Sequence, residues 1–212
     1  GIDLDLARRD GERNLAKDET RREADGKTYP PFRDYAFKFN GDCASFFSEY
    51  LQSMWDSQKG QESKLQVNRE ARKNDTIFFT RTIPKFKNNP KDFSSFNMHK
   101  WLIETARDYI YIENQYLTSE KIVDLLIEKL KEPNGPEVII VVSYGKMPVI
   151  EKISMGALLT DCVKRLLEND PFKRLKIYTL TYGEGDQEEY VKIHSKQLER
   201  IQFIQYKMHL WM

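Results

Sequence analysis

The feature that most constrains the fold is an unbroken run of β-branched residues in "PEVIIVVSYG", residues 136–145. Its apolar residues do not alternate with polar ones, which is typical of a central strand covered on both faces. Another strand-like run, "YIYIENQYL", precedes it at residues 109–117, and the amphipathic segment 118–135 separates the two. Strands that alternate with helices of this length predict an α/β domain, with a layered mixed β-sheet flanked by helices.

Local patterns predict the other elements of the chain. Apolar residues recur at helical spacing in three further segments, over residues 42–57, 94–109 and 155–171. Strand patterns occupy residues 34–41, 76–84, 174–183 and 189–196. The expected helix N-caps are Ser94 or Ser95 and Thr118 or Ser119. Residues 1–31 interleave both charge signs, which predicts a long polar surface loop.

The charge balance and the cysteine content exclude several classes of protein. The 34 basic and 33 acidic residues give no net field to attract nucleic acid or a membrane, so any anion must be held by a local site. Cys43 and Cys162 show no metal-binding spacing, and we expect two buried thiols rather than a disulfide or a zinc site. No apolar run approaches the roughly 20 residues of a transmembrane helix.

Polar residues follow two of the predicted strands, in "ENQ" at 113–115 and "HSK" at 194–196. Ligand sites of open α/β sheets gather at the carboxyl ends of strands. Residues i and i+2 of a strand share a face roughly 6–7 Å apart, so His194 and Lys196 would point the same way and Ser195 the opposite way. A phosphate fits between such a pair, with lysine on its oxygens and histidine as nucleophile or proton donor.

The residues beside these motifs have a supporting role or a simpler explanation. Glu113 and Gln115 share a face, and a carboxylate beside His194 would fix its tautomer. An isolated H-x-K is common by chance, however, and the 113–115 segment also suits a turn that caps the helix after Thr118. His99 lies within a predicted helix as a structural histidine, and His209 has no partner pattern.

Four segments, in order, resemble the phospholipase D superfamily, whose members carry two H-x-K-x4-D motifs. "GIDLDLARRD" resembles the segment after the first motif, and "YPPFRDYAFKFNGDCASFFSEYLQSMW" resembles the strand, glycine turn and helix that follow. "YIYIENQYL" is similar to the family's Ile-Tyr-Ile-Glu-Asn-Gln-Tyr-Phe, and "VKIHSK" to the start of the second motif. The resemblance covers almost the whole chain.

The resemblance implies a phosphodiesterase that works without a metal or other cofactor. The histidine of one motif attacks the phosphodiester, and that of the other protonates the leaving alcohol. His194 would transfer the proton and Lys196 would bind the phosphate. Glu113, Asn114 and Gln115 would support them or contact substrate. Asp34 and Asp3 are further candidate pocket residues from the matching segments.

The resemblance also implies a substrate class and shows that both motifs are incomplete in this chain. The expected substrate is a glycerophospholipid such as phosphatidylcholine at a membrane surface, with no nucleic acid, and phosphatidyl transfer as in cardiolipin synthases is the alternative. Residues 1–212 are expected to form a single catalytic region, a fragment that lacks the first motif. The second motif has Ile201 in place of its aspartate, and residues 197–212 form an atypical tail. A non-catalytic remnant is therefore the third hypothesis.

Overall fold

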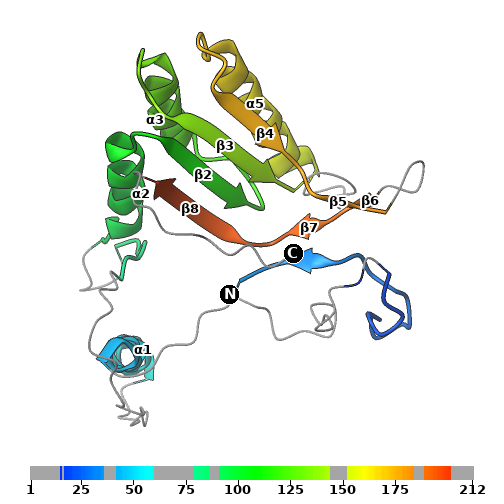
Figure 1. Ribbon diagram of the computed structural model, residues 1–212. Helices are drawn as coiled ribbons and strands as arrows, with labels where there is room; N and C mark the ends of the chain where they lie inside the picture. The colour runs from blue at the N-terminus through cyan, green and yellow to red at the C-terminus, as the bar shows by residue number, and fades with distance from the viewer. Residues whose placement is uncertain are drawn as a thin grey trace. The chain divides into compact units, whose positions relative to one another are not determined.

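The computed structural model describes residues 15, 17–35, 42–59, 79–85, 91–143, 152–183 and 189–201 (Figure 1). The chain divides into two compact units, one formed by Gly1–Tyr35 with Thr82–Met212 and the other by Ala36–Arg81. Asp3, His209 and the side chain of Cys43 lie outside the described part. So do residues 36–41 and 76–78 of the predicted strands and residues 202–212 of the tail.

The larger unit contains a four-stranded mixed sheet in the order β4-β3-β2-β8. Its strands are β2 (Tyr109–Asn114), β3 (Glu137–Val142), β4 (Leu175–Tyr178) and β8 (Lys196–Ile201). The first three run parallel, and β8 pairs antiparallel with β2. The predicted α/β class is confirmed, and the β-branched run does form a central strand, β3.

The helices of this unit cover one face of the sheet (Figure 1). They are α2 (Ser94–Thr105), α3 (Glu120–Lys131) and α5 (Ala157–Glu168), which follows the short π-helix η2 (Lys152–Gly156). Helix α3 buries residues at the helical spacing that the sequence shows, namely Val123, Leu126, Ile127 and Leu130. They pack on alternate strand residues of the same face, among them Ile110, Ile112, Val138 and Ile140. Cys162 is buried in this core, as expected.

Within the described ranges, two shorter pairs of strands accompany the four-stranded sheet, and the single strand predicted at 189–196 is wrong. β1 (Phe32–Arg33) pairs parallel with β7 (Lys192–Ile193), and β5 (Thr181–Tyr182) pairs antiparallel with β6 (Glu189–Tyr190). The chain therefore pairs with β5, then β1, then β2 as it runs from β6 through β7 to β8. Each change of partner ends a strand, which a local apolar pattern does not reveal.

The N-cap predicted for α2 and one predicted strand differ from the structure, whereas Ser119 is at the N-cap position of α3 as predicted. The side chain that binds the start of α2 is Asp92, whose Oδ1 accepts a hydrogen bond from Ser94 N at 2.8 Å. Ser119 holds the N-cap position of α3 but makes no side-chain cap hydrogen bond. In the described part of the strand predicted at 76–84, Ile83 forms only an isolated bridge to Asp92.

The smaller unit contains helix α1 (Asp42–Lys59), which confirms the helix predicted there. Three side chains of α1 meet the ring of Phe79, with ring centroids 5.3 Å away for Phe46, 4.0 Å for Phe47 and 6.3 Å for Tyr50. The guanidinium of Arg81 lies 4.8 Å from the ring centroid of Tyr50. An aromatic cluster therefore holds the 79–81 segment against α1.

The end of α3 is held by the guanidinium of Arg174, which precedes β4. Its nitrogens donate hydrogen bonds to the carbonyls of Leu130 (2.7 Å), Glu132 and Gly135. Leu130 lies in the last turn of α3, and Glu132 and Gly135 follow it, where no intrahelical donor remains to satisfy the carbonyls. A Cβ at Gly135 would clash with Lys129 O and Arg174 Nη1, so only glycine leaves room for this arrangement.

Replacing Arg174 by alanine is therefore expected to lower the free energy of unfolding by about 2 kcal/mol, because several carbonyls lose a charged donor. Chemical denaturation monitored by circular dichroism measures this change. Arg107→Ala, at an exposed position in the same unit, is the matched control. Equal losses in the two variants would contradict the capping role of Arg174.

Candidate phosphate site

The two polar motifs meet where β2 ends and β8 begins. In the β2–β8 ladder Asn114 lies opposite Lys196, and Glu113 lies opposite Gln197. His194 and Ser195 link β7 to β8. The structure thus brings together the 113–115 and 194–196 segments at the carboxyl end of a parallel strand, the place where ligand sites of such sheets gather.

The partner of His194 is Asp34. His194 Nδ1 lies 2.8 Å from Asp34 Oδ2, and the two side chains are only 18% and 14% exposed. Because a carboxylate can only accept, Nδ1 carries the hydrogen, and Nε2 is the nitrogen that can gain or lose a proton while this contact is kept. Asp34 Oδ1 also accepts a hydrogen bond from Tyr35 N at 2.9 Å, which fixes the orientation of the carboxylate.

The parallel pairing of β1 with β7 places Asp34 beside His194. Phe32 is in register with Lys192, and Arg33 with Ile193. The carbonyl oxygen of Arg33 then accepts hydrogen bonds from the backbone N–H groups of His194 (2.8 Å) and Ser195 (3.1 Å). Asp34, which follows Arg33, is therefore held against His194, which follows Ile193.

Burial and hydrogen bonding act in opposite directions on the pKa of Asp34. Burial raises the pKa, but the hydrogen bonds from His194 and from Tyr35 N, with the charge of His194, lower it by more. The net result is a pKa below the ordinary value of 3.8. The carboxylate is thus ionised at neutral pH.

Lys196 is exposed, and its Nζ donates a hydrogen bond to the carbonyl of His194 at 3.3 Å. Ser195, between His194 and Lys196, is only 1% exposed. This change in exposure agrees with the predicted alternation of the three side chains. The ammonium group of Lys196 is accordingly available at the surface to an anion.

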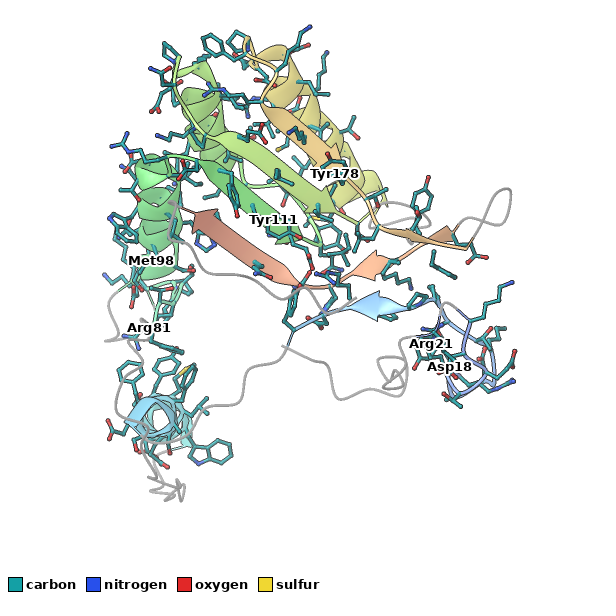
Figure 2. All side chains as sticks on the ribbon, viewed as in Figure 1. Asp18, Arg21, Arg81, Met98, Tyr111 and Tyr178 are labelled. Carbon is teal, nitrogen blue, oxygen red and sulfur yellow. The ribbon has the colours of Figure 1, made fainter. Side chains whose placement is uncertain are left out.

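Glu113 lies in a different set of contacts from the one expected. Its carboxylate is fully buried and accepts hydrogen bonds from Arg33 Nε (2.8 and 2.9 Å), from Tyr111 OH (2.7 Å) and from Ser195 Oγ. Tyr111 lies on the same strand, two residues earlier (Figure 2). The carboxylate that orients His194 is thus Asp34, because Glu113 points to the opposite face of the sheet from Asn114 and Lys196.

The same cluster shifts two other pKa values. Burial lowers the pKa of Arg33, but the hydrogen bond to Glu113 and its negative charge outweigh burial and leave the pKa raised. Burial is also the largest influence on Tyr111, and the hydrogen bond to Glu113 adds to it, so the pKa of this phenol is raised. Arg33 therefore stays charged and Tyr111 stays a donor over the physiological range of pH.

Within the described part of the chain, the contacts of the remaining candidates are with residues close to them in the sequence. Gln115 Nε2 donates to Tyr116 OH at 2.9 Å, and Asn114 Oδ1 accepts from Tyr116 N at 3.3 Å, which fits the alternative of a turn. His99 Nδ1 lies 2.7 Å from the carbonyl of Ser95 in its own helix, as a structural histidine would. Ile201 pairs with Tyr109 at the opposite end of β8 from Lys196, about 17 Å away along the strand.

The sequence interpretation missed the supporting roles of Arg33, Tyr111 and Ser195. For Ser195, the alternation of side chains along a strand is the one local indication, because it predicts that Ser195 points away from His194. Nothing local marks Arg33, because its partner Glu113 is 80 residues away in the sequence. That contact exists only because β1 pairs with β7.

Other possible features of a site are limited in the part of the chain that the structure describes. No group of three or more His, Cys, Asp or Glu side chains gathers there as a metal site would require. Within the same ranges, no helix has the length and apolarity needed to cross a bilayer. Comparison with known proteins gives no relationship, since no family model and no curated protein matches the chain.

The lowered pKa of Asp34 predicts a stability that depends on pH. A carboxylate whose pKa is lower in the folded state stabilises the protein above its unfolded pKa, and this contribution is lost as the pH falls through the folded value. The difference in free energy of unfolding between the wild type and Asp34→Asn should therefore shrink from pH 5 to pH 2. Ordinary histidines are already charged throughout that range.

Denaturant unfolding at several pH values measures this difference. Asp161→Asn, at an exposed position on α5, is the matched control and should alter stability little at any pH. A difference for Asp34→Asn that is the same at pH 5 and pH 2 would show that its carboxylate gains nothing from the contact with His194.

Proposed function

We propose that this chain carries one half of a phospholipase D-like phosphodiesterase site, and that it is a member of that superfamily. The observation that supports this most directly is the 2.8 Å contact between His194 Nδ1 and Asp34 Oδ2, with Lys196 two residues further on. A histidine oriented by a carboxylate that is only 14% exposed, and followed by an exposed lysine, suits phosphoryl chemistry.

In this proposal each group has a defined role. Lys196 binds the non-bridging oxygens of a phosphodiester and offsets their negative charge. His194, charged by proton uptake at Nε2, donates that proton to the leaving alcohol oxygen. Asp34 holds the ring in place and stabilises its charged form. As the alcohol departs, the imidazole becomes neutral and can take a proton from the water that completes hydrolysis.

The nucleophile of this reaction comes from a second H-x-K motif. The 212 residues contain one such motif, at His194–Lys196. A second copy of the chain or a further segment of a longer chain would bring the attacking histidine to the opposite side of the phosphate. Without that partner the site is a phosphate-binding half-site, which is the non-catalytic alternative.

The substrate class follows from the resemblance, which favours a glycerophospholipid. Hydrolysis of phosphatidylcholine would give phosphatidic acid and free choline. The same half-site serves phosphatidyl transfer when an alcohol replaces water, so the products distinguish the two reactions.

Binding of inorganic phosphate tests the half-site without requiring turnover. Lys196→Met should weaken binding about tenfold, because it removes the charge that contacts the anion, whereas His194→Ala should weaken it less. Lys192→Met is the matched control: it removes an equal charge from β7, where the ammonium lies over the ring of Phe32. Isothermal titration calorimetry measures the affinities, and equal losses for the two lysine variants would contradict a built phosphate site.

Release of choline from phosphatidylcholine vesicles tests catalysis. We expect turnover that His194→Ala abolishes, provided that the purified chain supplies its own second motif by self-association. Phosphate binding that depends on Lys196 without any release of choline would support the non-catalytic half-site. Added ethanol that diverts the product to phosphatidylethanol would show transfer.

A further inference from the structure

We infer that Glu113 is the positioning residue of this site, an inference that rests on the function proposed for His194 and Lys196. Its carboxylate is fully buried and makes no contact with either residue among the described interactions. It acts through Arg33 and Ser195, and through them it sets where the histidine and the lysine lie.

The contacts form a closed ring of three residues. Glu113 accepts hydrogen bonds from Arg33 Nε and from Ser195 Oγ. The ring is completed by the backbone, because Ser195 N donates to the carbonyl of Arg33 at 3.1 Å. Each of these residues is thus held by two others, and they come from β1, β2 and the turn before β8.

Every residue of the proposed phosphate site is a chain neighbour of a ring member. Asp34 follows Arg33, Asn114 follows Glu113, and Ser195 is flanked by His194 and Lys196. Successive side chains of an extended backbone point to opposite sides, so a ring on one side holds the reactive groups on the other. A shift of Arg33 or Ser195 would move Asp34, His194 and Lys196 with it.

A charged residue suits this position better than a neutral one. The ring closes around a carboxylate that takes hydrogen bonds from a guanidinium, a phenol and a hydroxyl. Glu113→Gln would replace one acceptor oxygen by an amide NH2 that faces donors, and it would weaken the charge-assisted hydrogen bonds from Arg33, whose side chain is 43% exposed. Substitution should therefore open the ring rather than leave it in place.

Two readouts on the full chain separate positioning from mere stability. The first is the affinity for inorganic phosphate. The second is the ¹⁵N NMR signal of the His194 imidazole, assigned with His194→Ala. This signal reports the Nδ1–H hydrogen bond to Asp34. Glu113→Gln should weaken phosphate binding about tenfold or more and shift the Nδ1 signal, because small displacements of reactive groups are costly.

Ser195→Ala removes a single hydroxyl from the ring and should change both readouts in the same direction by a smaller factor. The double variant should lose no more phosphate affinity than Glu113→Gln alone, because both act through one ring. Glu137→Gln, which removes an exposed carboxylate paired with Lys176 on the same sheet, should change neither readout. Circular dichroism and thermal unfolding identify the variants that fold, and Ser195→Ala carries the test if Glu113→Gln does not.

Unchanged phosphate affinity and an unchanged His194 signal in a folded ring variant would overturn the inference, as would an equal effect of Glu137→Gln. Failure of the proposed function looks different. In that case wild-type phosphate binding would not depend on Lys196, while the Nδ1 signal would still report whether the ring positions His194.

Discussion

A fully buried carboxylate must be given donors, and in this protein that requirement joins three distant parts of the chain. Glu113 receives them from Arg33, Tyr111 and Ser195, which lie on β1, on β2 and in the turn before β8. The sheet and its helices would form a core without these contacts. The polar edge of the sheet depends on them, because β1 and β7 have two residues each and such short pairs are weak on their own.

Much of the sheet and its helices follows from local sequence. The β-branched run of β3 and the helical spacing of α3 are strong local signals, and both elements form as expected. The segment from Ile193 to Lys196 shows the limit of such signals. Its apolar and polar residues suit one long strand, but its backbone leaves β1 and joins β2 within a few residues. Competition between β1 and β2 as pairing partners decides where the strand changes partner. The local sequence alone does not predict this position.

In the candidate site, too, local sequence predicts some features and long-range pairing decides the others. The period of a strand placed His194 and Lys196 apart from Ser195, and the exposure of these residues agrees. The period did not reveal which carboxylate binds His194, because Asp34 is 160 residues away in the sequence. Position 201, where the resemblance leads us to expect the aspartate of the second motif, is in register with Tyr109 at the far end of β8, and the carboxylate that contacts the histidine is Asp34.

The alternation of the two sets of side chains has a consequence for how this chain tolerates change. Side chains on both sides of the backbone have defined roles. Arg33 and Ser195 bind the buried carboxylate of Glu113, whereas Asp34, His194 and Lys196 lie on the other side. A single residue inserted between Ser195 and Lys196 would shift His194 and Ser195 by one position relative to β8, turning the imidazole toward the side of Glu113 and the serine hydroxyl away from it. Single substitutions can weaken the site by degrees, whereas a one-residue insertion in this turn would reverse it.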